Sequence, residues 1–389
     1  MMWWWITGIL LGLIWLWRVL DAAFGMPKVP DLARPEFDAQ PQSTPKVTIV
    51  VPARNEEAHL EPALSSLLQL DYPDYEVIAV DDRSSDGTGP MMEQVAAAHR
   101  SHPELRVLHV SELPPGWLGK PHAMWLAAAQ ARGKWLLFTD ADVTFRPDVL
   151  RRAMAYAEKT GADHMVIFPS MTGWSTGKKI VLAGFNILFV FGHRAWKVAD
   201  PKARDHLGVG AFNLVRREAY QAAGTFEALR MEVIEDMRLG KLVKDSGAAQ
   251  RCAFGTDMIT LRWGEGARGV IDNLTKNFFA LVHFSVPRAI GACVLLLFLN
   301  LLPFVGVILA PGWAKLGFAG ALLGIFCMYL GMYIRAPIAP WYFIFHPLST
   351  AALVYTMLRS MVHVLRHDGI VWRDTKYSLE ELRRGLIRG

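Results

Sequence analysis

Hydrophobic and polar residues divide the chain into three stretches with different patterns. The first, Met1 to Val19, is rich in Trp, Ile and Leu and carries no charge before Arg18. After a polar, proline-rich run, short apolar segments alternate with amphipathic ones, and long apolar runs return after about residue 278. We therefore predict a membrane anchor, a water-soluble domain and a second membrane region.

The N-terminal stretch has the features of a signal anchor. A cleaved signal peptide would carry positive charge before its apolar run and small residues after it, and neither is clear here. Basic residues instead follow the run closely, and the positive-inside rule then places the next domain in the cytoplasm; they are Arg18, Lys28, Arg34 and Lys46. We expect an anchor at residues 1–24 and an extended linker at 25–45.

Two apolar segments near the C-terminus are long enough to span a bilayer, Ala289–Ala310 and Ala314–Ile334, with a short turn between them. A third stretch, Trp341–Leu365, is less apolar and contains two histidines and an arginine. The tail after it is basic, which favours a cytoplasmic location. Two spans after the soluble domain would place the tail there, whereas three would place it outside. We therefore expect the third stretch to be re-entrant or interfacial.

One further apolar segment, Lys178–Arg194, interrupts the soluble domain and is short for a span. An interfacial amphipathic helix and a buried core helix both fit it. The expected domains are then the soluble domain at residues 46–265, an interfacial segment at 266–288, a membrane region at 289–365 and a basic tail at 366–389.

Strand and helix patterns alternate in the soluble domain. The pattern predicts strands at Lys46–Val51, Tyr75–Val80, Leu105–Val110 and Lys134–Thr139, with helices at Glu57–Leu70, Asp86–Ala98 and Pro121–Arg132 between them. This alternation predicts an α/β fold with a parallel sheet covered by helices on both faces. Ligands of such sheets bind at the carboxyl ends of the strands.

Composition agrees with membrane attachment. The 389 residues are 52% hydrophobic, with a net charge of +5 and a pI near 9.1. The basic residues flank apolar segments, which favours anionic lipid headgroups as partners, and no nucleic-acid motif is present. The three cysteines are isolated, so neither a zinc site nor a disulfide framework is predicted.

Polar clusters follow each predicted strand. Pro52-Ala53-Arg54-Asn55-Glu56 comes after the first strand and, taken alone, is a polar turn before a helix. Asp81 and Asp82 end the second strand, where adjacent carboxylates repel each other unless a donor or cation is present. Gly119-Lys120 opens a helix, where an anionic group is favoured, although a surface lysine would fit equally.

Two more acidic clusters lie further along the chain. Asp140-Ala141-Asp142 directly follows the apolar fourth strand, and alternate residues of an extended segment point to one side. Two converging carboxylates are stabilised by a hard divalent cation that also binds a diphosphate. Glu235-Asp236 opens a predicted helix, where Asp236 either complements the helix dipole or serves as a general base.

The order of these clusters resembles family 2 glycosyltransferases of the GT-A fold, which is Rossmann-like. The motifs run from Val47 to about Gly247 and include Gly208-Val209-Gly210-Ala211-Phe212-Asn213 before Glu235-Asp236. The resemblance implies an inverting, metal-dependent glycosyltransferase. It implies a multi-pass protein of the cell inner membrane with its catalytic domain in the cytoplasm.

The resemblance also implies roles for individual residues. The catalytic base would be Asp236, and Mg²⁺ or Mn²⁺ would be bound by Asp142 and Asp140. The nucleotide-sugar donor, expected to be a UDP-sugar, would be bound by Pro52, Arg54, Glu56, Asp82, Lys120 and Asp140. Candidate contacts to phosphate, acceptor or lipid headgroups are Glu235, Arg262, Trp263, Arg268 and Lys276.

One motif departs from the family pattern. Processive members carry Gln/Arg-x-x-Arg-Trp after the base, and here Ile259 precedes Arg262-Trp263 at the polar position. With few spans as well, we expect transfer of a single sugar to a lipid-like acceptor. The segments Leu274–Asn277 and Trp372–Tyr377 are similar to those of members that glycosylate lipids, carotenoids or hopanoids. A processive polysaccharide synthase and a non-catalytic membrane scaffold are the alternatives.

Overall fold

The computed structural model describes residues 2–99, 102–372 and 375–386, which form two compact units. The helical unit comprises the segment before Val29 together with Gly173–Trp196 and Trp263–Ile370. The sheet-containing unit comprises Val29–Thr172, Lys197–Arg262 and the segment after Ile370.

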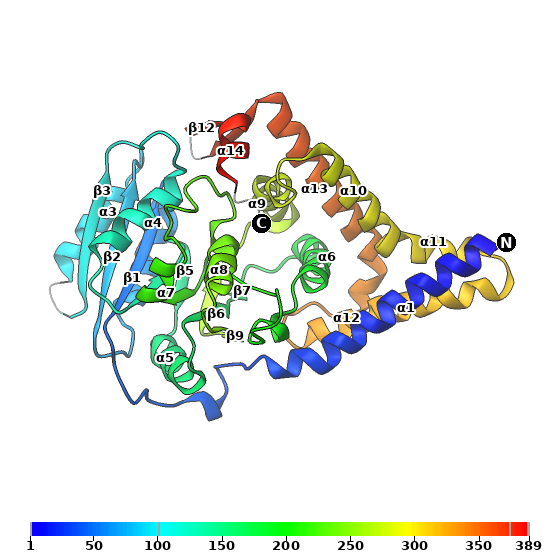
Figure 1. Cartoon of the computed structure of the whole chain (residues 1–389), viewed down its shortest axis with the longest axis horizontal. Coiled ribbons are helices and arrows are strands. Elements are labelled where there is room, and N and C mark those ends of the chain that lie inside the picture. Colours follow the sequence, from blue (N-terminus) through cyan, green and yellow to red (C-terminus); the bar gives the residue numbers. More distant parts are fainter. Residues whose placement is uncertain (1, 100–101, 373–374, 387–389) are drawn as a thin grey trace. The chain divides into compact units, whose positions relative to one another are not determined.

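A seven-stranded sheet with the order β3-β2-β1-β4-β8-β6-β9 forms the centre of the sheet-containing unit (Figure 1). The strands are β1 (Val47–Ala53), β2 (Tyr75–Asp82), β3 (Glu104–Val110), β4 (Trp135–Phe138), β6 (His164–Phe168), β8 (Asn213–Arg216) and β9 (Gln250–Phe254). The first four strands in chain order pair in parallel, as predicted.

The sequence pattern did not predict β8, which runs antiparallel to both β4 and β6. The chain enters β8 from the loop Leu207–Phe212, whose Gly210 accepts a hydrogen bond from Asp140 just after β4. Because β8 therefore starts at the edge where β4 ends, it has to run in the opposite direction. This reversal brings the glycine-rich loop to the carboxyl edge of the parallel strands.

Helices cover both faces of this sheet. They are α2 (Glu57–Leu67), α3 (Thr88–Ala98), α4 (Gly119–Gln130), α5 (Val149–Thr160), α7 (Arg217–Ala222) and α8 (Glu235–Asp245). In β1, Ile49 and Val51 join the core cluster containing α2 and α5, whereas Val50 joins the cluster containing α4 and α8. Alternate side chains of β1 thus serve two cores, which explains why this strand is apolar at nearly every position.

Smaller elements complete this unit. A three-stranded sheet is formed by β5 (Val143–Phe145), β10 (Ile259–Leu261) and β7 (Ser170–Met171). Within the predicted linker at 25–45, Leu32 is fully buried and its N–H donates to the carbonyl of Phe254. The tail contains β11 (Gly369–Trp372), β12 (Thr375–Ser378) and α14 (Leu379–Gly385).

The helical unit holds the apolar segments. Its helices are α1 (Met2–Gly25), α6 (Thr176–Gly192), α9 (Gly266–Leu281), α10 (Val286–Leu296), α11 (Leu302–Leu309), α12 (Lys315–Tyr333) and α13 (His346–Arg366). A π-helical turn at Leu297–Leu301 joins α10 to α11, and short 3₁₀ helices occur at Met26–Lys28, Gly312–Ala314 and Pro340–Phe345. Two further 3₁₀ helices are Pro35–Phe37 in the sheet-containing unit and Ala195–Lys197 at the boundary of the two units. Within the part of the chain that the structure describes, four segments are long and apolar enough to cross a membrane: Met2–Lys28, Val286–Leu309, Gly312–Tyr333 and Pro340–Arg366.

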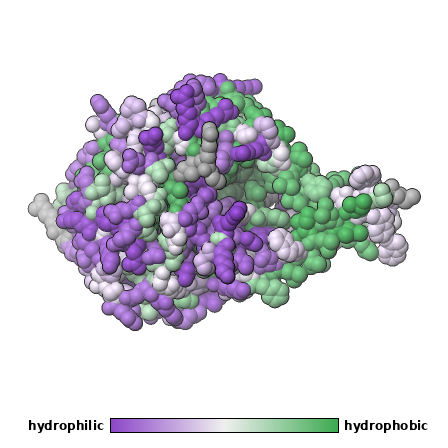
Figure 2. Space-filling model, in the orientation of Figure 1, coloured by the Kyte–Doolittle hydropathy of each residue, from purple (hydrophilic) through white to green (hydrophobic). Residues whose placement is uncertain are grey.

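Glycines allow α1 and α12 to pack closely along their lengths (Figure 1). A Cβ atom on Gly12 would lie 2.9 Å from the carbonyl oxygen of Gly317, and one on Gly317 would clash with the backbone at Gly8. Small residues at such spacing are typical of helix pairs in membranes. The outer surface of this pair is mainly hydrophobic (Figure 2), with Leu13 59% and Leu323 63% exposed.

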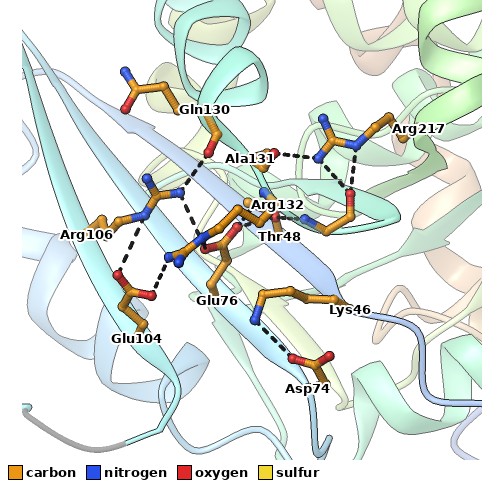
Figure 3. A network of polar contacts seen from close by, with 11 residues as sticks. Lys46, Thr48, Asp74, Glu76, Glu104, Arg106, Gln130, Ala131, Arg132 and Arg217 are labelled. Carbon is orange, nitrogen blue, oxygen red and sulfur yellow. Dashed lines mark hydrogen bonds and ion pairs between the residues drawn. The ribbon is translucent and has the colours of Figure 1, made fainter.

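A buried ionic network ties the sheet together at the edge where β1 and β2 begin (Figure 3). The Glu76 carboxylate is fully buried and accepts hydrogen bonds from the Thr48 hydroxyl at 2.7 Å and from Arg132 Nε at 2.8 Å. Arg106 approaches the same carboxylate at 3.4 Å. These groups satisfy the buried charge, which would otherwise be strongly destabilising.

Candidate active site

Two loops at the carboxyl ends of β1 and β2 are hydrogen-bonded to each other. The backbone N–H of Asn55 donates to the Ser84 hydroxyl at 3.1 Å, and that of Ser85 donates to the Asn55 side chain at 2.8 Å. The backbone N–H of Glu56 donates to the Thr88 hydroxyl at 2.8 Å. Asn55 itself has a φ of 55°, an uncommon conformation that this network holds in place.

Asp82, at the end of β2, is 5% exposed and lies beside the start of α4. Its two carboxylate oxygens accept hydrogen bonds from Arg83, at 2.7 Å from Nε and 3.1 Å from Nη2. A Cβ atom on Gly119 would clash with the Asp82 carboxylate, so glycine at the first position of α4 is what allows this approach.

Lys120 follows Gly119 and lies between two carboxylates. Its Nζ is 2.6 Å from Oδ1 of Asp140 and 2.6 Å from Oε1 of Glu235. Burial opposes the charge on Lys120, but the two carboxylates outweigh it and raise its pKa. Burial also raises the pKa of Glu235 to about 7, against the opposing effect of Lys120.

Asp236 occupies the first turn of α8, as predicted from its position before an amphipathic segment. Its Oδ2 accepts a hydrogen bond from the Gly210 backbone at 2.9 Å, and its Oδ1 accepts one from the Met237 backbone at 2.7 Å. Burial raises the pKa of Asp236, while Lys120 and the backbone donors oppose the shift. A raised pKa makes this carboxylate a better proton acceptor.

Burial raises the pKa of Asp142 to about 6, and the charges of Asp140 and Glu56 add to this shift. The Asp140 and Asp142 carboxylates therefore repel each other. Among the residues that the structure describes, no group of three or more His, Cys, Asp or Glu side chains is arranged to hold a metal ion. Mg²⁺ commonly binds through one or two carboxylates together with substrate phosphates. The Asp140–Asp142 pair fits a site of that kind.

One small pocket unites much of this chemistry. Its lining comes from α4, from the ends of β4 and β8 and from the start of α8, and consists of Lys120, Met124, Phe138, Thr139, Asp140, Gly210, Asn213, Phe226, Glu235 and Asp236. Four carboxylates, with Asp142 included, face the ammonium of Lys120. The surplus of negative charge favours divalent cations, and a cation would in turn attract a diphosphate.

The structure joins Asp82 to this carboxylate cluster through the start of α4. Asp82 touches Gly119, and the next residue, Lys120, reaches Asp140 and Glu235. Pro52 is buried inside β1, and Arg54 after it donates to the Thr375 hydroxyl at 3.4 Å.

The other candidate residues belong to other elements. Arg262 follows β10 in the sheet-containing unit, whereas Trp263 belongs to the helical unit, where its ring lies 5.3 Å from that of Phe185. Arg268 and Lys276 are exposed on α9. In the tail motif Trp372–Tyr377, Arg373 and Asp374 lie outside the described residues.

Sequence reasoning did not assign site roles to Gly210 or Arg83. Gly210 contacts both Asp140 and Asp236. Its position in a Gly-x-Gly sequence before a strand is the feature of the sequence that could have indicated a site role. Arg83, with a φ of 56°, directly follows the acidic pair, but its contact with Asp82 depends on a backbone conformation that the sequence does not reveal.

The arrangement of sheet, strand-end carboxylates and glycine loop defines an α/β enzyme fold of the GT-A class. The mannosyltransferase PcManGT from Pyrobaculum calidifontis, solved with GDP-Man and Mn²⁺, has this fold: its TM-score is 0.56 at 18% identity, with 93% of this chain and 99% of that chain covered. Residues 48–224 match the family model described as Glycosyl transferase family 2.

Relatives with assigned names agree. The 4,4'-diaponeurosporenoate glycosyltransferases of Staphylococcus aureus strains MRSA252 and bovine RF122 / ET3-1 are each 24% identical over 345 residues, covering 86% of this chain and 89% of theirs. The family match and these relatives support a family 2 glycosyltransferase domain at residues 48–224 with sugar transfer as its activity, and the solved structure supports the GT-A fold.

Proposed function

We propose that this protein transfers one sugar, with inversion, from a nucleoside diphosphate sugar to a lipid-like acceptor at the cytoplasmic face of the cell inner membrane. The observation that carries the proposal is the convergence of Lys120, Asp140, Glu235 and Asp236 on one pocket, with Asp82 joined to them through Gly119. In this proposal the donor lies along that chain of contacts. The nucleoside is near Asp82 and the diphosphate is near Lys120 and Asp140.

The donor phosphates meet a negatively charged site, so a divalent cation accompanies them. Asp142 and Asp140 would hold Mg²⁺ or Mn²⁺, and the ion would supply positive charge to the leaving diphosphate. Burial, Asp140 and Glu56 raise the pKa of Asp142 to about 6, and a bound cation would relieve the repulsion between these carboxylates. PcManGT was solved with a nucleotide sugar and Mn²⁺, which agrees with this choice of cofactor. We propose UDP as the nucleotide and a hexose as the sugar.

Asp236 acts as the base. Hydrogen bonds from Gly210 and Met237 fix both oxygens of its carboxylate, so its orientation is set before substrate arrives. It takes the proton from the acceptor hydroxyl as the oxygen attacks the anomeric carbon and the bond to the nucleoside diphosphate breaks. Lys120 keeps Glu235 paired, which leaves Asp236 to accept the proton. The product is a glycoside with one sugar and inverted configuration.

The acceptor is proposed from membrane attachment and from the relatives. Among the described residues four segments have the length and hydropathy to cross a bilayer, and the named relatives are 4,4'-diaponeurosporenoate glycosyltransferases. A long apolar molecule with one polar end would remain in the bilayer while presenting that end to the enzyme. This reasoning favours a lipid, carotenoid or hopanoid-like acceptor over a soluble one.

Chain connectivity supports a definite membrane topology. Thr172 and Lys197 both belong to the sheet-containing unit, so the single helix α6 between them begins and ends on one side of the bilayer. Arg262 and Val371 also belong to that unit, so the chain between them crosses an even number of times. We propose that α10–α11 and α12 cross as a pair, and that α13 does not cross.

The choice of α13 as the helix that stays on one side follows from its burial. In the most apolar 18 residues of Pro340–Arg366, the segment that contains α13, 44% of residues are buried within the protein. The corresponding share is 22% for Val286–Leu309 and 28% for Gly312–Tyr333. It packs against α6 and α9, and the Ser349 hydroxyl donates to the carbonyl of Ile180. This topology agrees with the sequence-based prediction of a re-entrant or interfacial third stretch and a cytoplasmic tail.

A direct test uses the full-length protein in lipid nanodiscs with UDP-hexoses and Mn²⁺. We expect nucleotide release that Asp236→Asn lowers by about 100-fold or more. The matched control is Asp245→Asn, the same substitution at the exposed far end of α8. Lipids from cells expressing either form are then compared by mass spectrometry, and the active form should add one glycolipid with a single sugar. Equal turnover in the wild type and Asp236→Asn would reject the assigned base.

The processive alternative predicts long products in the same assay. Ile259, which stands where processive members carry a polar residue, is fully buried in β10 and pairs with Phe145. Its side chain therefore cannot hydrogen-bond to a growing polysaccharide.

A non-catalytic scaffold predicts that the wild type does not bind UDP with Mn²⁺, and calorimetric titration measures this binding.

A further inference from the structure

The C-terminal tail is fixed onto the sheet-containing unit beside Asp82. Leu382 of α14 is fully buried, and Tyr377 of β12 is 6% exposed. The Ser378 hydroxyl and the Glu381 side chain form a capping box that starts α14. These contacts are those of a folded segment, so the last strand and helix are an integral part of the unit that contains the candidate site.

Three of the tail's polar contacts converge on the surroundings of Asp82. The backbone N–H of Gly119 donates to the Tyr377 hydroxyl at 3.2 Å in a buried hydrogen bond. The Arg83 and Arg54 guanidinium groups each donate to the Thr375 hydroxyl at 3.4 Å. The same Arg83 holds the Asp82 carboxylate through two hydrogen bonds. The tail thus contacts Arg83, which bonds the Asp82 carboxylate, and Gly119, which lies against it.

A second observation at this place is an unused polar atom. His122, one turn into α4, is 7% exposed, and its buried Nδ1 has no hydrogen-bond partner among the described residues. Its ring packs edge-on against Trp117 at 5.4 Å. Burial lowers the pKa of His122, Asp82 opposes the shift and Arg83 adds to it. A buried imidazole nitrogen without a partner is costly unless a ligand supplies one.

We propose that the tail completes the nucleoside part of the donor site, with Tyr377 as a positioning residue that sets Gly119 and Arg83 for the nucleobase and ribose. The inference rests on the proposed function, because it takes Asp82 as the nucleoside contact. Arg83 presents a planar guanidinium and Asp82 a carboxylate, the two groups suited to a flat base with N–H and C=O edges. Tyr377 acts through these groups, and the diphosphate is bound elsewhere, by Lys120 and the carboxylate pair.

The division between nucleoside and diphosphate provides a test. Full-length wild type and Tyr377→Phe in nanodiscs are titrated with UDP and with inorganic pyrophosphate, both with Mn²⁺. Loss of one hydrogen-bonding hydroxyl should weaken UDP binding roughly 5- to 10-fold. Pyrophosphate binding should not change. In turnover assays the KM for the donor should rise while kcat and the KM for the acceptor stay within about twofold of wild type.

The matched control is Tyr355→Phe, which removes the same hydroxyl from a residue that is 56% exposed on α13. Equal UDP affinity in wild type and Tyr377→Phe would overturn the inference. Parallel weakening of UDP and pyrophosphate would also overturn it, since that result indicates a general loss of structure. Failure of wild type to bind UDP, GDP or any other nucleoside diphosphate would instead refute the proposed function itself. The two failures are therefore distinguishable.

Discussion

The backbone N–H of Gly210 donates a hydrogen bond to the Asp236 carboxylate at 2.9 Å. The carbonyl of the same glycine accepts one from the backbone N–H of Asp140 at 3.1 Å. One residue of a loop thus connects the proposed base to the proposed metal-binding pair. A Cβ atom there would lie 2.5 Å from Oδ2 of Asp140, so only glycine allows both contacts without displacement.

Gly210→Ala should therefore impair catalysis more than folding. The methyl group displaces the Asp140 carboxylate and disturbs the alignment of Asp236, and we expect kcat to fall by about 10- to 100-fold. The melting temperature should change by only a few degrees. Nucleotide release and thermal unfolding measure the two effects. Gly291→Ala is the control, because no atom lies within 4 Å of its added Cβ. Full activity in Gly210→Ala would show that the loop does not set the site geometry.

The fold around this loop was largely predictable because each strand is apolar and each is followed by a polar cluster. The positions of Asp82, Lys120, Asp140 and Asp236 at strand ends or helix starts followed from that pattern. Neither the existence nor the reversed direction of β8 did, since only two of its four residues, Leu214 and Val215, are apolar, too few for a periodic pattern. The hydrogen bond between Gly119 and Tyr377 could not be predicted either, because it joins residues separated by 258 positions in the sequence.

Asp142 should make the protein less stable at neutral pH than in mild acid. Burial and neighbouring carboxylates raise its pKa from 3.8 to about 6, so the folded state binds its proton more tightly than the unfolded state does. The stability that this proton provides is present below pH 4 and is lost as the pH rises through 6. Asp142→Asn should therefore raise the melting temperature at pH 8 and leave it unchanged near pH 4.

The same variant should lose activity, and the two effects can be separated with ligands. Mn²⁺ with UDP should raise the melting temperature of wild type at pH 8 more than that of Asp142→Asn, because the ionised carboxylate binds the cation. Nucleotide release should drop by about 100-fold or more, as expected when a metal ligand is removed. A variant that responds to Mn²⁺ and UDP as wild type does would remove Asp142 from the metal site.

Glu76 should contribute to stability and not to catalysis. Burial alone would raise its pKa, but the Thr48 hydroxyl and the Arg132 backbone and side chain lower it below the usual 4.5. Glu76→Ala removes the acceptor of the buried Thr48 hydroxyl and one partner of Arg132 and Arg106, and should cost about 1–3 kcal/mol in free energy of unfolding. Because the folded pKa is depressed, this stabilisation should be present near pH 7 and decline as the pH falls below 4.5.

Denaturant unfolding at several pH values tests this expectation for Glu76. Glu104→Ala is the control, since Glu104 belongs to the same network but its side chain is 52% exposed. It should cost less than about 1 kcal/mol. Below its unfolding temperature, Glu76→Ala should retain wild-type KM values, because Glu76 lies at the opposite end of β2 from Asp82. Equal losses in the two variants would mean that burial does not set the energy of this network.

The glycine contacts between α1 and α12 predict that the N-terminal anchor is held specifically. Gly317→Leu should separate the helices, because even a Cβ atom at this position would overlap the backbone of Gly8. We expect a lower melting temperature in detergent and faster proteolysis of the anchor. Gly331→Leu adds the same side chain to α12 at a position with no atom within 4 Å of the Cβ. If both variants melt at the same lower temperature, the glycine contacts are not what holds α1.

The proposed topology can be tested by the access of a membrane-impermeant thiol reagent to single introduced cysteines. Trp313 lies between α11 and α12 and is 73% exposed, whereas Glu380 in the tail has a side chain that is 71% exposed. If α10–α11 and α12 cross as a pair and α13 stays on one side, Trp313→Cys in intact cells should react. Glu380→Cys should react only after the cells are opened.

Two controls make that result decisive. Asp245→Cys, exposed at the end of α8 in the sheet-containing unit, should behave as Glu380→Cys does, because both belong to one unit on one side of the bilayer. The parent protein, with Cys252 and Cys293 buried and Cys327 partly buried, gives the background. Labelling of Glu380→Cys but not Asp245→Cys in intact cells would mean three crossings after the catalytic domain. The tail could not then contact Gly119, and Tyr377 would lose its proposed role along with the topology.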